Sequence, residues 1–350
     1  MSVQPVSPIR LPGGQARALR PCLRAAAAAA LALLAACGGG GSGDAGIPVV
    51  PSAATITANN YEGVARQAVN AADYMGDATG LVTGAQVAPG AQALFAFSRG
   101  QALRLGQLFA RSPQLLTGVT TTDTLGCSGG GNITVRATDV NGNEAVDAGD
   151  SGVLTANNCV EGGATISGTL SISFSAVSGN LDSDVYSATV SITMQGLAAS
   201  GAGGSATGNG SFTIAIASNS ATSGSIDMLV PSLVLTGNLG GVNDTITLQD
   251  YHLVTSTALS GGRLRTSTTV SGGMSSNSVA GGLVTLSTVQ PLVEFETDAY
   301  PSSGQLLASG ANGTRMRLTV QSTTSVLLEL DADGNGSYET NAIRTWDALI

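Results

Sequence analysis

The sequence predicts a mainly β fold: an antiparallel meander of about ten strands that forms a curved sheet or barrel, covered by two N-terminal helices. Two observations lead to this prediction. From about residue 131 onward, apolar residues alternate with serine and threonine, in runs separated by breaks rich in Gly, Ser and Asn. Between residues 59 and 111, apolar residues recur instead at helical spacing. Because short turns join the strands, we expect them to pair antiparallel, with the helices on the apolar face.

The first predicted helix spans residues 59–79. Asn59 and Glu62 have the spacing of a capping box, and the apolar residues that follow recur every three or four positions. The second predicted helix spans residues 91–111 and ends before Ser112-Pro113. Its apolar residues cover too much of its circumference for a surface helix, so we expect it to be buried.

The alternation that defines the strands is clearest in residues 165–176. One face of this run is apolar and consists of Ile166, Leu170, Ile172, Phe174 and Ala176. The other face carries serine and threonine hydroxyls. The remaining predicted strands lie around 186–194, 212–216, 226–230, 244–258, 262–273, 282–297, 304–309, 314–321 and 325–330.

The composition excludes several classes of protein. The chain has 350 residues, with 14 arginines, no lysine, 23 acidic residues and a formal charge of −9. So few bases exclude a nucleic-acid-binding protein, which needs clustered positive charge. A hydrophobic content of 43% excludes a charge-rich disordered chain. An outer-membrane barrel needs aromatic girdles, which a chain with 4% aromatic residues lacks.

Residues 1–36 have the pattern of a signal peptide. Four arginines and no acid precede the apolar run Ala25–Ala36, and these 12 residues are fewer than the roughly 20 that span a bilayer. The run ends in Leu34-Ala35-Ala36-Cys37, which resembles the lipobox of bacterial lipoproteins. That resemblance implies cleavage before Cys37 and attachment of lipid, such as palmitate, to this cysteine. The alternative is a plain secretory signal with an incidental Cys37.

The predicted organisation is a signal peptide at 1–36, a lipid-anchored flexible linker at 37–58 and a single helix-plus-sheet domain at 59–350. Gly38, not Asp, follows Cys37. By resemblance to the enterobacterial sorting rule, this favours the outer membrane of a Gram-negative envelope. Loss of residues 1–36 removes four arginines and leaves a net charge of −13. Because such a chain does not adhere to anionic lipid, the acyl chains must provide the attachment.

Cys127 and Cys159 are expected to form a disulfide. They are the two cysteines that remain besides Cys37, and the envelope is an oxidising compartment. Closing a loop of about 32 residues would stabilise the fold by roughly 3–4 kcal/mol. The alternative is a pair of free buried thiols. A metal site is disfavoured, because no CxxC motif or histidine accompanies them.

Two acidic segments have the spacing of calcium-binding loops. In the first, oxygen-bearing side chains occupy positions 1, 3, 5, 9 and 12, namely Asp139, Asn141, Asn143, Asp147 and Asp150. Position 6 is Glu144, where the sharp turn of such a loop prefers glycine. The alternative is an acidic hairpin with a turn at Asn141-Gly142.

The second acidic segment has candidate ligands at positions 1, 3, 5 and 9, namely Asp331, Asp333, Asn335 and Glu339. It has the expected glycine at position 6, Gly336, but Ala342 at position 12 provides no side-chain oxygen. Asp333-Gly334 and Asn335-Gly336 are also common in hairpin turns, so a metal-free hairpin is the alternative here too. Ca²⁺ is the only cofactor that the sequence predicts.

A hydrolase is disfavoured. His252 is the only histidine and lies within a predicted strand, and no G-x-S-x-G elbow lies between a strand and a helix. We therefore expect a structural histidine and no enzymatic activity.

Several stretches, taken together, resemble a group of uncharacterised proteobacterial lipoproteins of the outer-membrane type. The stretches are the lipobox at Cys37, Cys127 with the glycines after it, Ala148-Gly149-Asp150-Ser151, Asn157–Gly163, Tyr300–Gly304, Gly310–Gly313 and Leu328–Trp346. The resemblance covers most of residues 127–350, and the group has no function that can be transferred. The sequence thus predicts a non-enzymatic envelope protein with a structural or binding role, held at the outer membrane by its N-terminal lipid. The alternative is a carrier of a lipid or other apolar ligand in a half-barrel cavity.

Overall fold

The computed structural model describes residues 52–79, part of 91–105, and 120–349 apart from a few positions in turns. In the second range these are the helical residues 91, 93–98, 100, 101 and 105. The turn positions left out are 180, 182, 202, 203, 240, 241 and 280. The predicted signal peptide and Cys37 lie outside the described residues.

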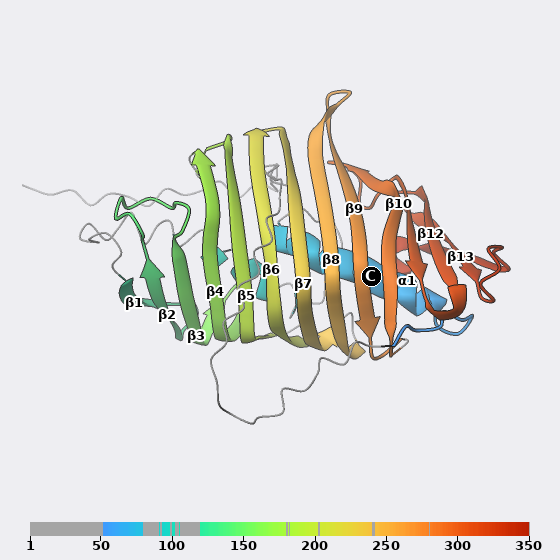
Figure 1. Cartoon of the computed structure of the whole chain (residues 1–350), viewed down its shortest axis with the longest axis horizontal. Coiled ribbons are helices and arrows are strands. Elements are labelled where there is room, and N and C mark those ends of the chain that lie inside the picture. The colour runs from blue at the N-terminus through green and yellow to red at the C-terminus, as the bar shows by residue number, and fades with distance from the viewer. Residues whose placement is uncertain are drawn as a thin grey trace, which may run out of the picture.

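The strands form one antiparallel meander of 14 strands, whose order in the sheet follows the chain (Figure 1). They are β1 Thr120–Gly126, β2 Asn132–Thr138, β3 Ser151–Glu161, β4 Ala164–Gly179, β5 Tyr186–Gly201, β6 Gly204–Ser220, β7 Ser223–Leu239, β8 Val242–Ser260, β9 Arg263–Ser276, β10 Leu283–Phe295, β11 Ser303–Ser309, β12 Arg315–Ser322, β13 Ser325–Asp331 and β14 Thr340–Thr345. The prediction of a mainly β meander is confirmed. The predicted number of about ten strands is wrong, and the sheet does not close into a barrel.

The four strands missing from the prediction are β1, β2, β3 and β14. β1 and β14 are the two edge strands, and β14 has no buried residue, so its sequence needs no apolar alternation. β2 and β3 flank the first acidic segment, and β3 contains a register shift between Ala156 and Cys159. The bulge interrupts the alternating pattern, because one extra residue changes the face on which the next side chain lies.

The predicted apolar face of residues 165–176 is buried up to Phe174, but not beyond it. A register shift in β4 separates Phe174 from Ala176. As a result Ala176 is exposed, and Val177 packs against the core in its place. Assigning Ala176 to the buried face was therefore wrong, because the bulge reverses the alternation.

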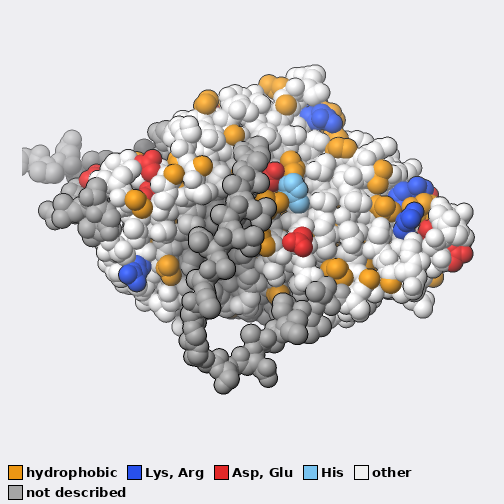
Figure 2. Space-filling model, in the orientation of Figure 1, with side chains coloured by type: hydrophobic (Ala, Val, Ile, Leu, Met, Phe, Trp, Pro, Cys, Tyr) orange, Lys and Arg blue, Asp and Glu red, His pale blue; other side chains and the backbone are white. Residues whose placement is uncertain are grey.

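The opposite face of the sheet is rich in hydroxyl groups. β4, β5 and β6 contain no charged residue. Hydroxyls meet across neighbouring strands, as in Ser191–Thr213 at 3.0 Å and Thr236–Thr245 at 3.2 Å. In the view of Figure 2, charged side chains are sparse over the described part of the sheet.

Helix α1, Tyr61–Thr79, lies across the strands on one face of the sheet (Figure 1). Its buried side chains include Val64, Ala68 and Met75, and it contacts β9, β11, β12 and β13. Glu62 does not complete the predicted capping box; its carboxylate binds the Arg344 guanidinium of β14 at 2.6 and 2.8 Å. This ion pair joins the first turn of α1 to the last strand.

The described residues between 91 and 105 are helical, as predicted, and residues 106–111 of that prediction lie outside the described part. Leu94, Phe95 and Leu105 are fully buried. The Phe95 ring packs at 6.0 Å from the ring of Phe212 in β6. Among the residues that the structure describes, no helix has the length and apolar character to cross a membrane.

Residues 52–58 belong to the predicted flexible linker, yet the structure places them on the sheet. Ala54 and Ile56 are buried, and Ala53 forms a parallel bridge with Leu283 at the start of β10. This segment meets the sheet at the end where the connections 277–282, 310–314 and 332–339 lie. We name it the tether end, and we name the opposite end of the strands the far end.

Candidate metal centre

The two acidic segments lie at opposite ends of the sheet. The first loop, residues 139–150, joins β2 to β3, and the second loop, residues 331–339, joins β13 to β14. In a meander, connections after even- and odd-numbered strands fall at opposite ends. The first loop is therefore at the far end and the second loop at the tether end.

The first loop is built around Asp139, whose side chain is fully buried. Its Oδ1 accepts the backbone N–H groups of Asn141 at 3.1 Å and Gly142 at 2.6 Å, and its Oδ2 accepts that of Glu144 at 3.0 Å. Glu144 has φ +66°, in the left-handed region that favours glycine. Position 6 thus makes the turn of a calcium loop, although it is not glycine.

The other predicted ligands of the first loop bind one another or the backbone. The Asp150 carboxylate is buried and accepts the N–H groups of Val140 at 2.9 Å and Asp147 at 2.7 Å. Asp147 accepts the side-chain amides of Asn141 at 2.8 Å and Asn143 at 2.5 Å. Burial raises the pKa of Asp150 above its usual value, although the two backbone hydrogen bonds act in the opposite direction.

The second loop repeats the central part of this hydrogen-bond scheme. The buried Asp331 accepts the N–H groups of positions 4 and 6, Gly334 at 2.7 Å and Gly336 at 3.0 Å. At position 5, Asn335 accepts the N–H of Ser337 at 2.7 Å, as Asn143 accepts that of Ala145 at 2.9 Å. The two loops therefore share one backbone design, with the first aspartate at its centre.

Only the second loop brings three carboxylates together. One oxygen each from Asp331, Asp333 and Glu339 lies within 4.8 Å of the others, whereas the described residues of the first loop form no such group. Carboxylate oxygens are the ligands that Ca²⁺ prefers. These three acids fit a calcium ion better than zinc, which favours nitrogen and sulfur ligands. The side-chain amide of Asn335 donates to Asp333 at 2.8 Å.

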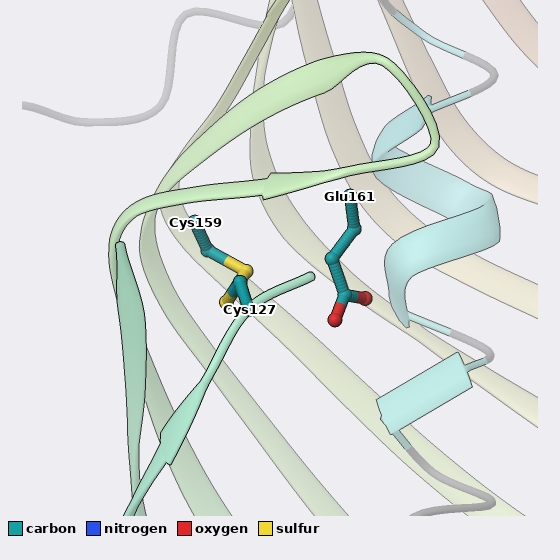
Figure 3. A group of neighbouring side chains, drawn as sticks. All are labelled: Cys127, Cys159 and Glu161. Atoms are coloured by element: carbon teal, nitrogen blue, oxygen red, sulfur yellow. A yellow bond between two sulfur atoms is a disulfide. The ribbon is translucent and has the colours of Figure 1, made fainter. Parts of the chain in front are cut away.

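The predicted disulfide between Cys127 and Cys159 is present. Its S–S distance is 2.01 Å and its Cα–Cα distance is 5.4 Å. It connects the residue after β1 to β3 at the tether end, and Glu161 lies beside it (Figure 3). Because both sulfurs belong to the disulfide, they are not free to ligate a metal in this state.

His252 forms a hydrogen bond from its Nε2 to Asp227 Oδ1 at 2.9 Å. Among the described residues, this contact with Asp227 is the one hydrogen bond that the structure gives to the His252 side chain. The sequence analysis did not identify Asp227. It lies two residues before Leu229, the residue opposite His252, and this strand register cannot be read from the sequence.

Comparisons of this chain with models of protein families, with curated proteins and with solved structures found no match in any of the three.

Proposed function

We propose that this protein is a non-enzymatic lipoprotein of a Gram-negative cell envelope, anchored at the outer membrane through an acylated Cys37. The observation that carries the proposal is the pairing of a basic and apolar segment ending at Cys37 with a domain that contains a disulfide. Disulfides persist in oxidising compartments, which an exported chain enters. The uncharged strands β4, β5 and β6 support a structural or binding role.

The anchor is tested by labelling the protein with radioactive palmitate in a Gram-negative host. We expect wild-type protein to incorporate the label and to partition into the detergent phase of Triton X-114. Cys37→Ser should lose both properties. Cys22→Ser is the matched control, because Cys22 lies within the segment that is removed. Equal labelling of wild type and Cys37→Ser would contradict the proposal.

We further propose that calcium stabilises the domain through the second loop. The support is the convergence of Asp331, Asp333 and Glu339, on a loop that closes the last hairpin of the sheet. A bound cation would offset the repulsion among these acids. We expect a higher melting temperature in calcium than in chelator, and no change at millimolar calcium would contradict the proposal.

The alternative, a carrier of an apolar ligand, has one observation in its favour. Three buried polar atoms on the helices, Gln67 Oε1, Asn70 Nδ2 and Gln101 Oε1, have no hydrogen-bond partner within the described protein. Buried polar groups are usually paired, and the polar group of a ligand between the helices and the sheet would pair them. Native mass spectrometry of purified protein tests this: a bound lipid mass supports the carrier, and the bare chain mass contradicts it.

A further inference from the structure

Four hydrogen bonds fix the segment 52–56 at the tether end. The N–H of Ala54 donates to the Leu283 carbonyl, and the N–H of Leu283 donates to the Ser52 carbonyl, both at 2.9 Å. On the other side, the N–H of Ala311 donates to the Ala54 carbonyl at 2.6 Å. The N–H of Ile56 donates to Thr314 Oγ1 at 3.0 Å in a buried bond. We call this arrangement the clasp.

The packing around the clasp leaves no room for a side chain at either of the two glycines that contact it, Gly282 and Gly310. A Cβ atom at Gly282 would lie 2.5 Å from the Ser52 carbonyl oxygen, and one at Gly310 would lie 2.4 Å from that of Ala54. Ala54 and Ile56 are themselves buried. The chain is therefore held firmly to the sheet from Ser52 onward. The distance between Cys37 and the domain is set by the residues between Cys37 and Ser52.

The distance between anchor and clasp limits how the domain can lie on a membrane. Ser52 follows Cys37 by 15 residues. A chain of this length reaches at most about 50 Å when fully extended. The longest strand, β8, has 19 residues and so extends about 60 Å toward the far end. The far end of β8 thus lies beyond the full reach of the 15 residues that separate Cys37 from Ser52.

We propose that the tether end of the sheet is the surface that faces the lipid bilayer. This inference rests on the proposed lipidation of Cys37 and adds to it the orientation of the domain. The connections 277–282, 310–314 and 332–339 then lie at the headgroups, and the second loop with them. The first loop and the other connections of the far end point away from the membrane, where a partner in solution can reach them.

Quenching of tryptophan fluorescence by brominated lipid measures this orientation, because the quenching requires close approach. The chain has one tryptophan, Trp346, which is buried and whose indole N–H donates to the Ser322 carbonyl, at the far end of β12. Ala332→Trp adds an exposed indole at the tether end, and Ala221→Trp adds one at the far end as the matched control. Circular dichroism checks that both variants fold.

The lipidated full chain is reconstituted in phosphatidylcholine vesicles that contain brominated phosphatidylcholine. We expect the emission that Ala332→Trp adds to that of wild type to fall at least twofold relative to unbrominated vesicles, with little change for the emission added by Ala221→Trp or for wild type. Stronger quenching of Ala221→Trp, or equal quenching of both variants, would overturn the proposed orientation. The orientation would also be overturned if the protein floats with the vesicles and neither variant is quenched. Flotation is measured first: if protein with Cys37 does not float, the proposed anchor has failed, not the orientation.

Discussion

The first and second loops share a scheme of backbone hydrogen bonds but differ in how their acidic side chains are arranged. In both, a buried aspartate at position 1 accepts the N–H groups of positions 4 and 6. In the first loop, two asparagine amides bind the acid at position 9. In the second loop, an aspartate at position 3 brings a third carboxylate into the group. Spacing thus determines the loop backbone, whereas residue identity at positions 3 and 9 determines whether three carboxylates lie together.

The largest expected effect on the free energy of unfolding comes from removing the aspartate at position 1 of each loop. Asp139→Ala and Asp331→Ala each remove at least two part-buried hydrogen bonds from backbone N–H groups to a carboxylate. A hydrogen bond to a charged group contributes about 1.5–3 kcal/mol, and partial exposure of the loop reduces this, so we expect each variant to lose about 2–4 kcal/mol in chelator. Urea unfolding measures this loss. Asp333→Ala is the control, because Asp333 is exposed. A loss below 1 kcal/mol for both central variants would contradict the shared design.

Calcium should distinguish the loops. At 100 times its Kd, a ligand stabilises a protein by about 2.7 kcal/mol, which corresponds to a rise in Tm of about 4 °C for a domain that spans residues 59–350. We expect Asp333→Asn and Glu339→Gln to abolish most of this rise. Asp147→Asn, at position 9 of the first loop, should leave the rise intact. Thermal unfolding with and without calcium provides the measurement. If Asp147→Asn abolished the rise in Tm and the two second-loop variants kept it, calcium would be assigned to the first loop.

The sequence pattern predicted the long strands that bury one face. It missed edge strand β14, which has no buried residue, but it also missed β2, which does bury one face. Long strands such as β4 alternate regularly, so their position and inner face were predicted, until the bulge at Phe174 reversed the alternation. Edge strand β14 buries nothing and carries no such signal. The loop ligands were predicted from spacing, but the convergence of Asp331 with Glu339 was not. That proximity depends on how β13 and β14 pair, which is a tertiary property.

The residue at position 6 of each loop provides a further test of the shared backbone, with a smaller expected effect on stability and opposite signs in the two loops. A residue with a Cβ in the left-handed region is strained, and glycine is not. We expect Glu144→Gly to stabilise the protein by about 0.5–1 kcal/mol, and Gly336→Ala to destabilise it by a similar amount. A Cβ atom at Gly336 would meet no atom within 4 Å, so the cost there is one of backbone conformation alone. Urea unfolding of both variants is the measurement, and a destabilising Glu144→Gly would show that the glutamate side chain has another role.

The smallest expected effect is a pH dependence from Asp150 in the first loop. Burial raises its folded-state pKa above the ordinary value of 3.8, so the folded protein holds this proton more tightly than the unfolded chain does. The stabilisation from that proton is fully present below pH 3.8 and is lost as the pH rises through the folded-state pKa. Asp150→Asn does not titrate, so we expect its stability to fall less than that of wild type over this range. Any cost of the lost hydrogen bond is independent of pH and shifts the whole curve without changing its slope. Urea unfolding in chelator across this pH range measures the difference, and parallel curves for the two proteins would show that the Asp150 carboxyl titrates alike in the folded and unfolded chains.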